Sequence, residues 1–101
     1  MSEQGPMTEA MYYILLALTK PGYGYGMMQR IRELSCGRIE MGPGTLYGVL
    51  TRMNKEGLII LTSADGRRKN YEITEAGREA LLAEYRRLKE LVRDGKILEV
   101  E

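Results

Sequence analysis

The sequence predicts an α+β fold that is mainly α, and three observations predict it. A helical pattern over residues 43–56 is followed directly by two β-rich segments that flank Asp65-Gly66. Two apolar helical patterns precede this unit, and one long amphipathic pattern follows it. Asp-Gly between β-branched and aromatic residues is a strong signal for a hairpin. A helix followed by a hairpin with a cationic tip is the order of a winged helix-turn-helix, with an additional C-terminal helix.

Length and composition allow one small domain with its own core. The chain has 101 residues, of which 44% are hydrophobic and 29% are charged. No apolar run approaches the roughly 20 residues that a membrane-spanning helix needs. Residues 1–6 lack the basic segment that begins a signal peptide. We therefore expect a cytoplasmic protein with no role at a membrane.

The residue types that are missing exclude several kinds of chemistry. The sequence has no histidine and a single cysteine, Cys36. This rules out His-based triads, His or Cys clusters for metals, and an intramolecular disulfide. We therefore predict that the protein is not an enzyme and holds no metal or cofactor. Cys36 is either a redox-sensing thiol or a small residue near a helix end.

The first helix is predicted between Thr8, which can cap it, and Leu18. Apolar residues surround this helix almost completely, and such a helix is buried on more than one side. One side then meets the core of the domain, and we expect the other to meet a second chain.

A second helix is predicted over residues 25–35, after a break at residues 20–24 and before Gly37, which closes it. Residues 38–41 alternate polar and apolar side chains, which predicts a short strand. The third helix, over residues 43–56, has proline at its first turn as helices prefer.

The last helix is predicted over residues 75–93, with Thr74 as its cap and Gly95 at its end. Its apolar residues recur at steps of four, three and four, which is a heptad-like seam. We divide the chain into a winged helix-turn-helix domain at 1–74, with residues 1–6 disordered, and a dimerisation helix with a short tail at 75–101. The residues expected to mediate dimerisation are Met11, Leu15, Leu81, Tyr85, Leu88 and Val92.

The third helix has two distinct faces at about 100° per residue. Its core face carries Leu46, Val49, Leu50 and Met53, and its opposite face carries Gly44, Gly48, Thr51 and Lys55. Glycine inside a helix costs about 1 kcal/mol relative to alanine. A close approach of the helix to DNA explains Gly48, and packing against another part of the protein is the alternative.

The flanks of this helix carry groups that suit DNA phosphates. The helix start offers free backbone N–H groups, and Thr45 adds a hydroxyl. Tyr47 can reach a phosphate or can be a tyrosine at the edge of the core. Arg52 can contact phosphates or bases, or can form a surface ion pair.

The hairpin tip is the most basic part of the chain. Residues 42–71 hold five basic and two acidic residues, a net charge of +3 in a chain of net charge +1. Three of these cations are adjacent, at Arg67, Arg68 and Lys69. They suit phosphate contact or insertion into the minor groove, or they protect a solvated sheet edge.

Six segments taken in order resemble the PadR family of transcriptional regulators. They are 12–18, 24–26, 44–47, 52–59, 65–71 and 73–77. The resemblance implies a homodimeric repressor that dimerises through a single C-terminal helix. It places Tyr25, Thr45, Tyr47 and the wing cations where the family contacts DNA. It also implies a response to small aromatic or amphipathic effectors. The tyrosines and methionines of this chain either line a cavity for such a molecule or belong to the core.

The sequence therefore predicts a sequence-specific transcriptional regulator that binds double-stranded DNA as a homodimer at a pseudo-palindromic operator. The alternative, motivated by the low net charge, is a winged-helix protein-interaction module without DNA binding. The residues expected at the DNA are Tyr25, Gly44, Thr45, Tyr47, Gly48, Thr51, Arg52, Lys55, Arg67, Arg68 and Lys69.

Overall fold

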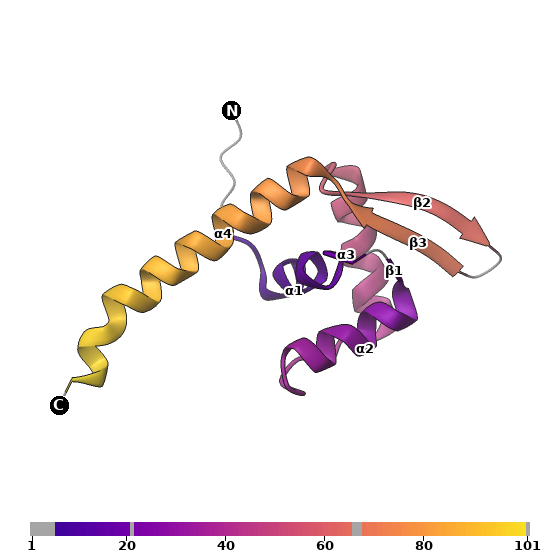
Figure 1. Ribbon diagram of the computed structural model, residues 1–101. Helices are drawn as coiled ribbons and strands as arrows, with labels where there is room; N and C mark the ends of the chain where they lie inside the picture. The colour runs from indigo at the N-terminus through magenta and orange to yellow at the C-terminus, as the bar shows by residue number, and fades with distance from the viewer. Residues whose placement is uncertain (1–5, 21, 66–67, 101) are drawn as a thin grey trace.

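The computed structural model describes residues 6–20, 22–65 and 68–100, without the side chains of 22–25, 64, 65 and 68. In Figure 1, three short helices form a body, a hairpin projects from one side of it, and the last helix extends away on the other. The elements are α1 (Glu9–Ala17), β1 (Gly22–Tyr23), α2 (Gly24–Leu34), α3 (Pro43–Lys55), β2 (Ile59–Asp65), β3 (Arg68–Ile73), α4 (Glu75–Asp94) and the 3-10 helix η1 (Gly95–Glu99).

The core forms where the three short helices meet the base of the hairpin. The predicted core face of α3 is confirmed, because Leu46, Leu50 and Met53 are fully buried, while Val49 is half-buried. The other large, fully buried side chains come from α1, α2 and β2 and from the residue after α1: Ile14, Leu15, Leu18, Ile31 and Ile59.

Both predicted threonine caps are confirmed. The hydroxyl of Thr8 accepts a hydrogen bond from the Met11 amide at 3.1 Å, and that of Thr74 accepts one from the Gly77 amide at 3.0 Å. The Thr74 hydroxyl also donates to the Gly57 carbonyl at 2.7 Å. This second bond ties the start of α4 to the end of α3, so the cap joins the body to the last helix.

The predicted strand at residues 38–41 is wrong. These residues are irregular, and Ile39 packs against the core. The third strand is instead β1, whose Gly22 and Tyr23 pair with Tyr71 and Asn70 of β3. Alternation over four residues is only a weak signal for a strand. β1 forms because β3 has a free edge, and the segment that follows α1 lies beside that edge.

The hairpin turn lies one residue later than predicted. Asp65 pairs with Arg68, so Asp65 is a strand residue rather than part of the turn. Gly66 and Arg67, on which the rest of that prediction falls, lie outside the described residues. A bulge at Thr62, between Leu61 and Ser63, interrupts the register and shifts the outward-facing positions of the wing by one residue.

The structure describes most of the predicted C-terminal tail but only the last residue of the N-terminal segment that was expected to be disordered. Residues 1–5, which belong to the segment expected to be disordered, lie outside the described residues. The expected short tail after Gly95 begins with a five-residue 3-10 helix, Gly95–Glu99. Within residues 6–20, 22–65 and 68–100, no helix combines the length and hydropathy needed to cross a bilayer.

Candidate nucleic-acid interface

The start of α3 is open toward solvent. Gly42 caps the helix with extended backbone geometry and makes no side-chain cap bond, and Pro43 occupies the first turn. Gly42, Gly44 and Thr45 are all exposed. The first amides of a helix lack partners within the helix and carry its positive dipole end. This end of α3 can therefore donate hydrogen bonds to an anionic group.

The outer face of α3 has room that the chain itself does not use. Gly44, Gly48, Thr51 and Lys55 are all exposed. A Cβ atom added at Gly44 or Gly48 would meet no atom of the described residues within 4 Å. Packing within the described part of the chain therefore does not explain why glycine stands at position 48.

The sequence left two roles open for Tyr47, which are a phosphate contact and a place at the edge of the core. Tyr47 is half-buried and packs against the core, so its ring belongs to the core edge. Burial, with a smaller effect of Tyr47, raises the pKa of the Tyr71 phenol. The side chain of Tyr47 on α3 thus lies near Tyr71 of β3.

Arg52 forms a surface ion pair, which was one of the two roles that the sequence allowed for it. Its Nε lies 3.3 Å from Oε2 of Glu56, one turn further along α3, and both side chains are largely exposed. Such exposed pairs contribute little to stability and are easily exchanged. The guanidinium therefore stays available to a phosphate.

The wing is stiffened beside its basic tip. The Asn70 amide donates to the Ser63 hydroxyl at 2.9 Å, and the Thr62 hydroxyl donates to the Asn70 carbonyl at 3.2 Å. Lys69 is exposed next to these bonds. Arg67 and the side chains of Arg68 and Tyr25 lie outside the description, although Arg68 begins β3 and Tyr25 stands in the first turn of α2.

The dimerisation residues predicted on α1 need correction. Met11 is 8% exposed and Leu15 is fully buried, so both belong to the core of the chain itself. The apolar pattern all around α1 hid which side faces the core. The outer side of α1 instead carries the half-buried Tyr12 and Leu16.

The residues of the seam predicted on α4 differ in how exposed they are. Leu81 is nearly buried against the body, whereas Tyr85 and Val92 are 47% and 61% exposed, and Leu88 is half-buried. Leu91 is exposed on the same helix, and further exposed apolar residues, which the prediction did not include, follow toward the C-terminus: Ile97, Leu98 and Val100.

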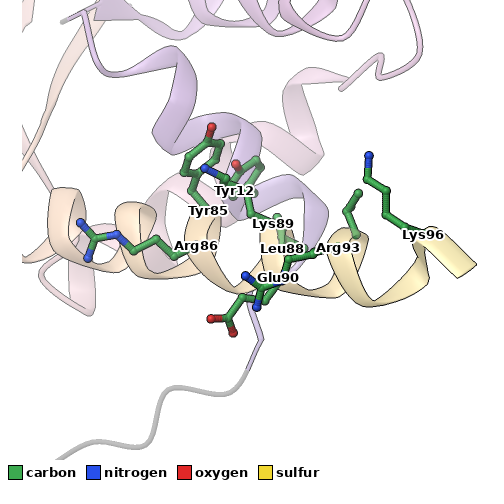
Figure 2. A pocket seen from close by; sticks show the side chains of 9 residues that line it. Tyr12, Tyr85, Arg86, Leu88, Lys89, Glu90, Arg93 and Lys96 are labelled. Carbon is green, nitrogen blue, oxygen red and sulfur yellow. The ribbon is translucent and has the colours of Figure 1, made fainter.

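A groove of about 650 Å³ runs along the outer half of α4. Figure 2 shows Tyr85 on α4 close to Tyr12 of α1, with the basic side chains of α4 following toward the C-terminus. The Nζ atom of Lys89 lies 5.4 Å from the centre of the Tyr85 ring. The groove thus combines two tyrosines and an apolar floor with a cationic border: Arg86, Lys89, Arg93 and Lys96.

An ion pair lies within α4, where the helix packs against the body. Glu84 is nearly buried and accepts two hydrogen bonds from Arg87, at 3.0 and 2.6 Å. The hydrogen bond from Arg87 is the main cause that lowers the pKa of Glu84, and the Met7 amide acts in the same direction. This carboxylate therefore links α4 to the segment before α1.

The described architecture defines a class of protein. An exposed third helix followed by an antiparallel hairpin, on a body of two further helices, is a winged helix-turn-helix. Residues 14–83 match the Transcriptional regulator PadR-like family. The chain belongs to this family, and the resemblance seen in its sequence is confirmed.

Known relatives agree in sequence and in structure. Transcriptional regulator Rv3488 of Mycobacterium tuberculosis is 42% identical over 66 residues, which cover 62% of this chain and 62% of that protein. A PadR-like transcription factor from Bacteroides fragilis is 28% identical, with a TM-score of 0.74 and 87% of both chains covered.

One solved structure similar to this chain contains DNA. Bacillus subtilis PadR, in complex with operator DNA, is 25% identical with a TM-score of 0.67, over 79% of this chain and 48% of that chain. The chain spans less than two thirds of the first curated relatives. It covers 62% of the mycobacterial protein and 21% of a transposon protein from Streptomyces fradiae that is 36% identical over 74 residues.

Proposed function

We propose that the protein is a homodimeric repressor that binds a pseudo-palindromic operator with α3 in the major groove and the wing beside it. The observation that carries this proposal is the outer face of α3, where Gly44 and Gly48 leave open space that nothing in the described chain fills. A backbone that can approach closely, an open helix start and nearby cations together suit DNA. The operator complex of Bacillus subtilis PadR supports the same assignment.

The course of α4 supports the dimer. Gly77, Leu81 and Glu84 on its first half are buried against the body. The same face continues as Leu88, Leu91 and Val92, of which the last two are more than half exposed. Figure 1 shows this second half extending beyond the body. A second copy, packed on this face by a two-fold axis, would cover it and place two α3 helices on one DNA duplex.

Binding to the promoter region of its own operon tests the proposal. We expect a specific complex that weakens steeply between 50 and 200 mM salt, because phosphate contacts release counterions. Replacing Arg67, Arg68 and Lys69 together by alanine should lower affinity for all sequences alike. A matched control removes three exposed cations of α4 and η1, Arg86, Arg93 and Lys96, and should retain tight binding. Equal affinity for the operator and for random DNA would contradict the proposal.

The alternative, a protein-interaction module, makes the opposite prediction for the same variants. If the protein acts by binding another protein and has no role at nucleic acid, the triple wing variant keeps its regulatory effect in cells. The open face of α3 favours DNA, because the close approach that it allows suits a groove in a duplex.

We also propose that the groove on α4, which shares Leu88 and Val92 with the proposed dimer face, receives between the two copies the small amphipathic effector implied by the resemblance. Its volume of about 650 Å³ falls within the range of ligand sites, which is about 300–1,000 Å³. Tyr12 and Tyr85 can stack on a ring, and the cationic border suits an anionic group. Tyrosine fluorescence should change on titration with an aromatic carboxylate, and Tyr85→Leu should weaken that response. An unchanged fluorescence signal would contradict this assignment.

A further inference from the structure

We propose that Thr51 is a specificity-determining residue of the interface, and that its methyl group contacts the C5-methyl group of a thymine in each half-site. This inference rests on the proposed DNA binding. It assigns thymine as the base that Thr51 of α3 contacts. The fold by itself assigns no base to any residue.

The first step is the position of Thr51. It stands seven residues after Gly44, three after Gly48 and four before Lys55, so these residues form one line along the exposed face of α3. Because neither glycine has a side chain, the helix backbone can approach a groove floor near Gly48. A short side chain one turn further along then comes within reach of base edges.

The second step is the orientation of the Thr51 side chain. Its hydroxyl donates to the Tyr47 carbonyl at 2.8 Å, within the same helix. Threonine in a helix often makes this bond to the carbonyl four residues earlier. The hydroxyl proton is thereby used within the helix, and the methyl group is the apolar part of the exposed side chain that can contact a partner.

The third step is the set of small residues that precede it on this line. Gly44 and Gly48 have no side chain, and Tyr47 packs against the core. The methyl group of Thr51 is therefore the first side-chain group along this line that can reach the floor of a groove. In the major groove, thymine is the base that offers a methyl group for such a contact.

The experiment begins with duplexes selected by the full-length wild-type protein from a pool with randomised positions. Each thymine of a selected half-site is then replaced singly by deoxyuridine, which lacks only the methyl group. Binding is measured at one fixed salt concentration. At one thymine per half-site we expect about a fourfold loss of affinity, the effect of one buried methyl group.

Three variants identify the residue that makes the contact. Thr51→Ser keeps the hydroxyl and should abolish the preference for thymine over uracil at that position. Thr51→Val keeps methyl groups and should retain the preference. Thr19→Ser is the matched control, because the Thr19 hydroxyl makes a similar bond, to the Leu16 carbonyl at 2.8 Å, at the end of α1. This control should also retain the preference.

The outcomes separate the two proposals. If Thr51→Ser keeps the full preference, if Thr51→Val loses it, or if no thymine of the selected duplex is sensitive in the wild type, the inference about Thr51 is wrong and DNA binding stands. If no sequence is selected at all, the proposed sequence-specific binding is contradicted, and the inference with it. The thymine replacements need no variant protein, so this test does not depend on how a variant folds.

Discussion

At the scale of single residues, two helical glycines stand in opposite surroundings. Gly48 on α3 faces open space, whereas Gly77 on α4 lies against the body. A Cβ atom at Gly77 would overlap the Leu58 carbonyl oxygen and lie 2.8 Å from Cγ1 of Ile73. The same substitution at the two positions should therefore have opposite effects on stability.

Gly48→Ala is expected to stabilise the free protein and weaken DNA binding. Alanine favours a helix by up to about 1 kcal/mol over glycine, and the new methyl group meets no atom of the described chain. If the helix backbone approaches DNA at Gly48, the methyl group separates the surfaces and lowers affinity roughly tenfold. Urea denaturation and operator titration measure the two effects. Unchanged affinity would show that DNA does not approach this position.

Gly77→Ala is expected to destabilise the fold by about 1–3 kcal/mol, the usual range for overpacking. The overlapping atom belongs to the backbone of Leu58, at the junction of α3 and the wing, and cannot swing aside as a flexible side chain would. Urea denaturation compared with Gly48→Ala provides the measurement. A variant as stable as the wild type would mean that α4 can shift away from the body without loss.

At the scale of elements, α4 is held by different interactions on its different sides. Thr74 ties its start to the end of α3, and Glu84 ties its middle to the segment before α1. Beyond these points the helix leaves the body. Contacts in the first half of α4 therefore determine the position of its second half, which extends beyond the body.

Glu84→Gln should lower stability at neutral pH and have little effect in acid. The Arg87 hydrogen bond keeps the pKa of Glu84 below its ordinary value of 4.5. A lowered folded-state pKa adds stability that is fully present above the unfolded-state pKa and lost as pH falls through the folded-state value. Thermal unfolding should therefore show a larger difference from the wild type at pH 7 than near pH 3.

Glu79→Gln is the matched control for this change, because Glu79 is an exposed carboxylate on the same helix. It should leave stability nearly unchanged at both pH values. A loss for Glu84→Gln that is equally large at pH 3 would show that packing, rather than ionisation, is responsible.

At the scale of the whole molecule, the exposed apolar surface is concentrated on the outer half of α4 and on η1. Leu91, Val92, Ile97 and Leu98 are 53% to 80% exposed. Monomeric proteins rarely expose a continuous apolar surface of this kind. The proposed dimer accounts for this surface.

Leu91→Glu is expected to shift the dimer toward monomers, because a charge would be buried in the interface without a partner. Sedimentation equilibrium at micromolar concentration measures the mass. Leu34→Glu is the matched control, since Leu34 is 43% exposed at the end of α2 and outside the proposed interface. If the wild type itself has the mass of a monomer, the proposed dimer is wrong.

Local signals predicted much of this molecule correctly. Threonine caps, the glycine after α3 and the 3.6-residue pattern of α3 depend on residues that are neighbours along the chain, so they located four helices and a hairpin closely. The misplaced strand had a different origin. β1 forms because it pairs with β3, which is distant in the sequence. No pattern within residues 22–23 predicts a strand.

The sequence by itself determined the order of the four helices and the hairpin, the family of the protein and the glycine-lined face of α3, because each depends on residue types at fixed spacing. Only the tertiary structure decided which side of α1 is core, and so removed Met11 and Leu15 from the outer surface. It also decided that nothing within the described chain fills the space beside Gly48. Both facts depend on packing between segments far apart in the chain, which a pattern along one helix does not contain.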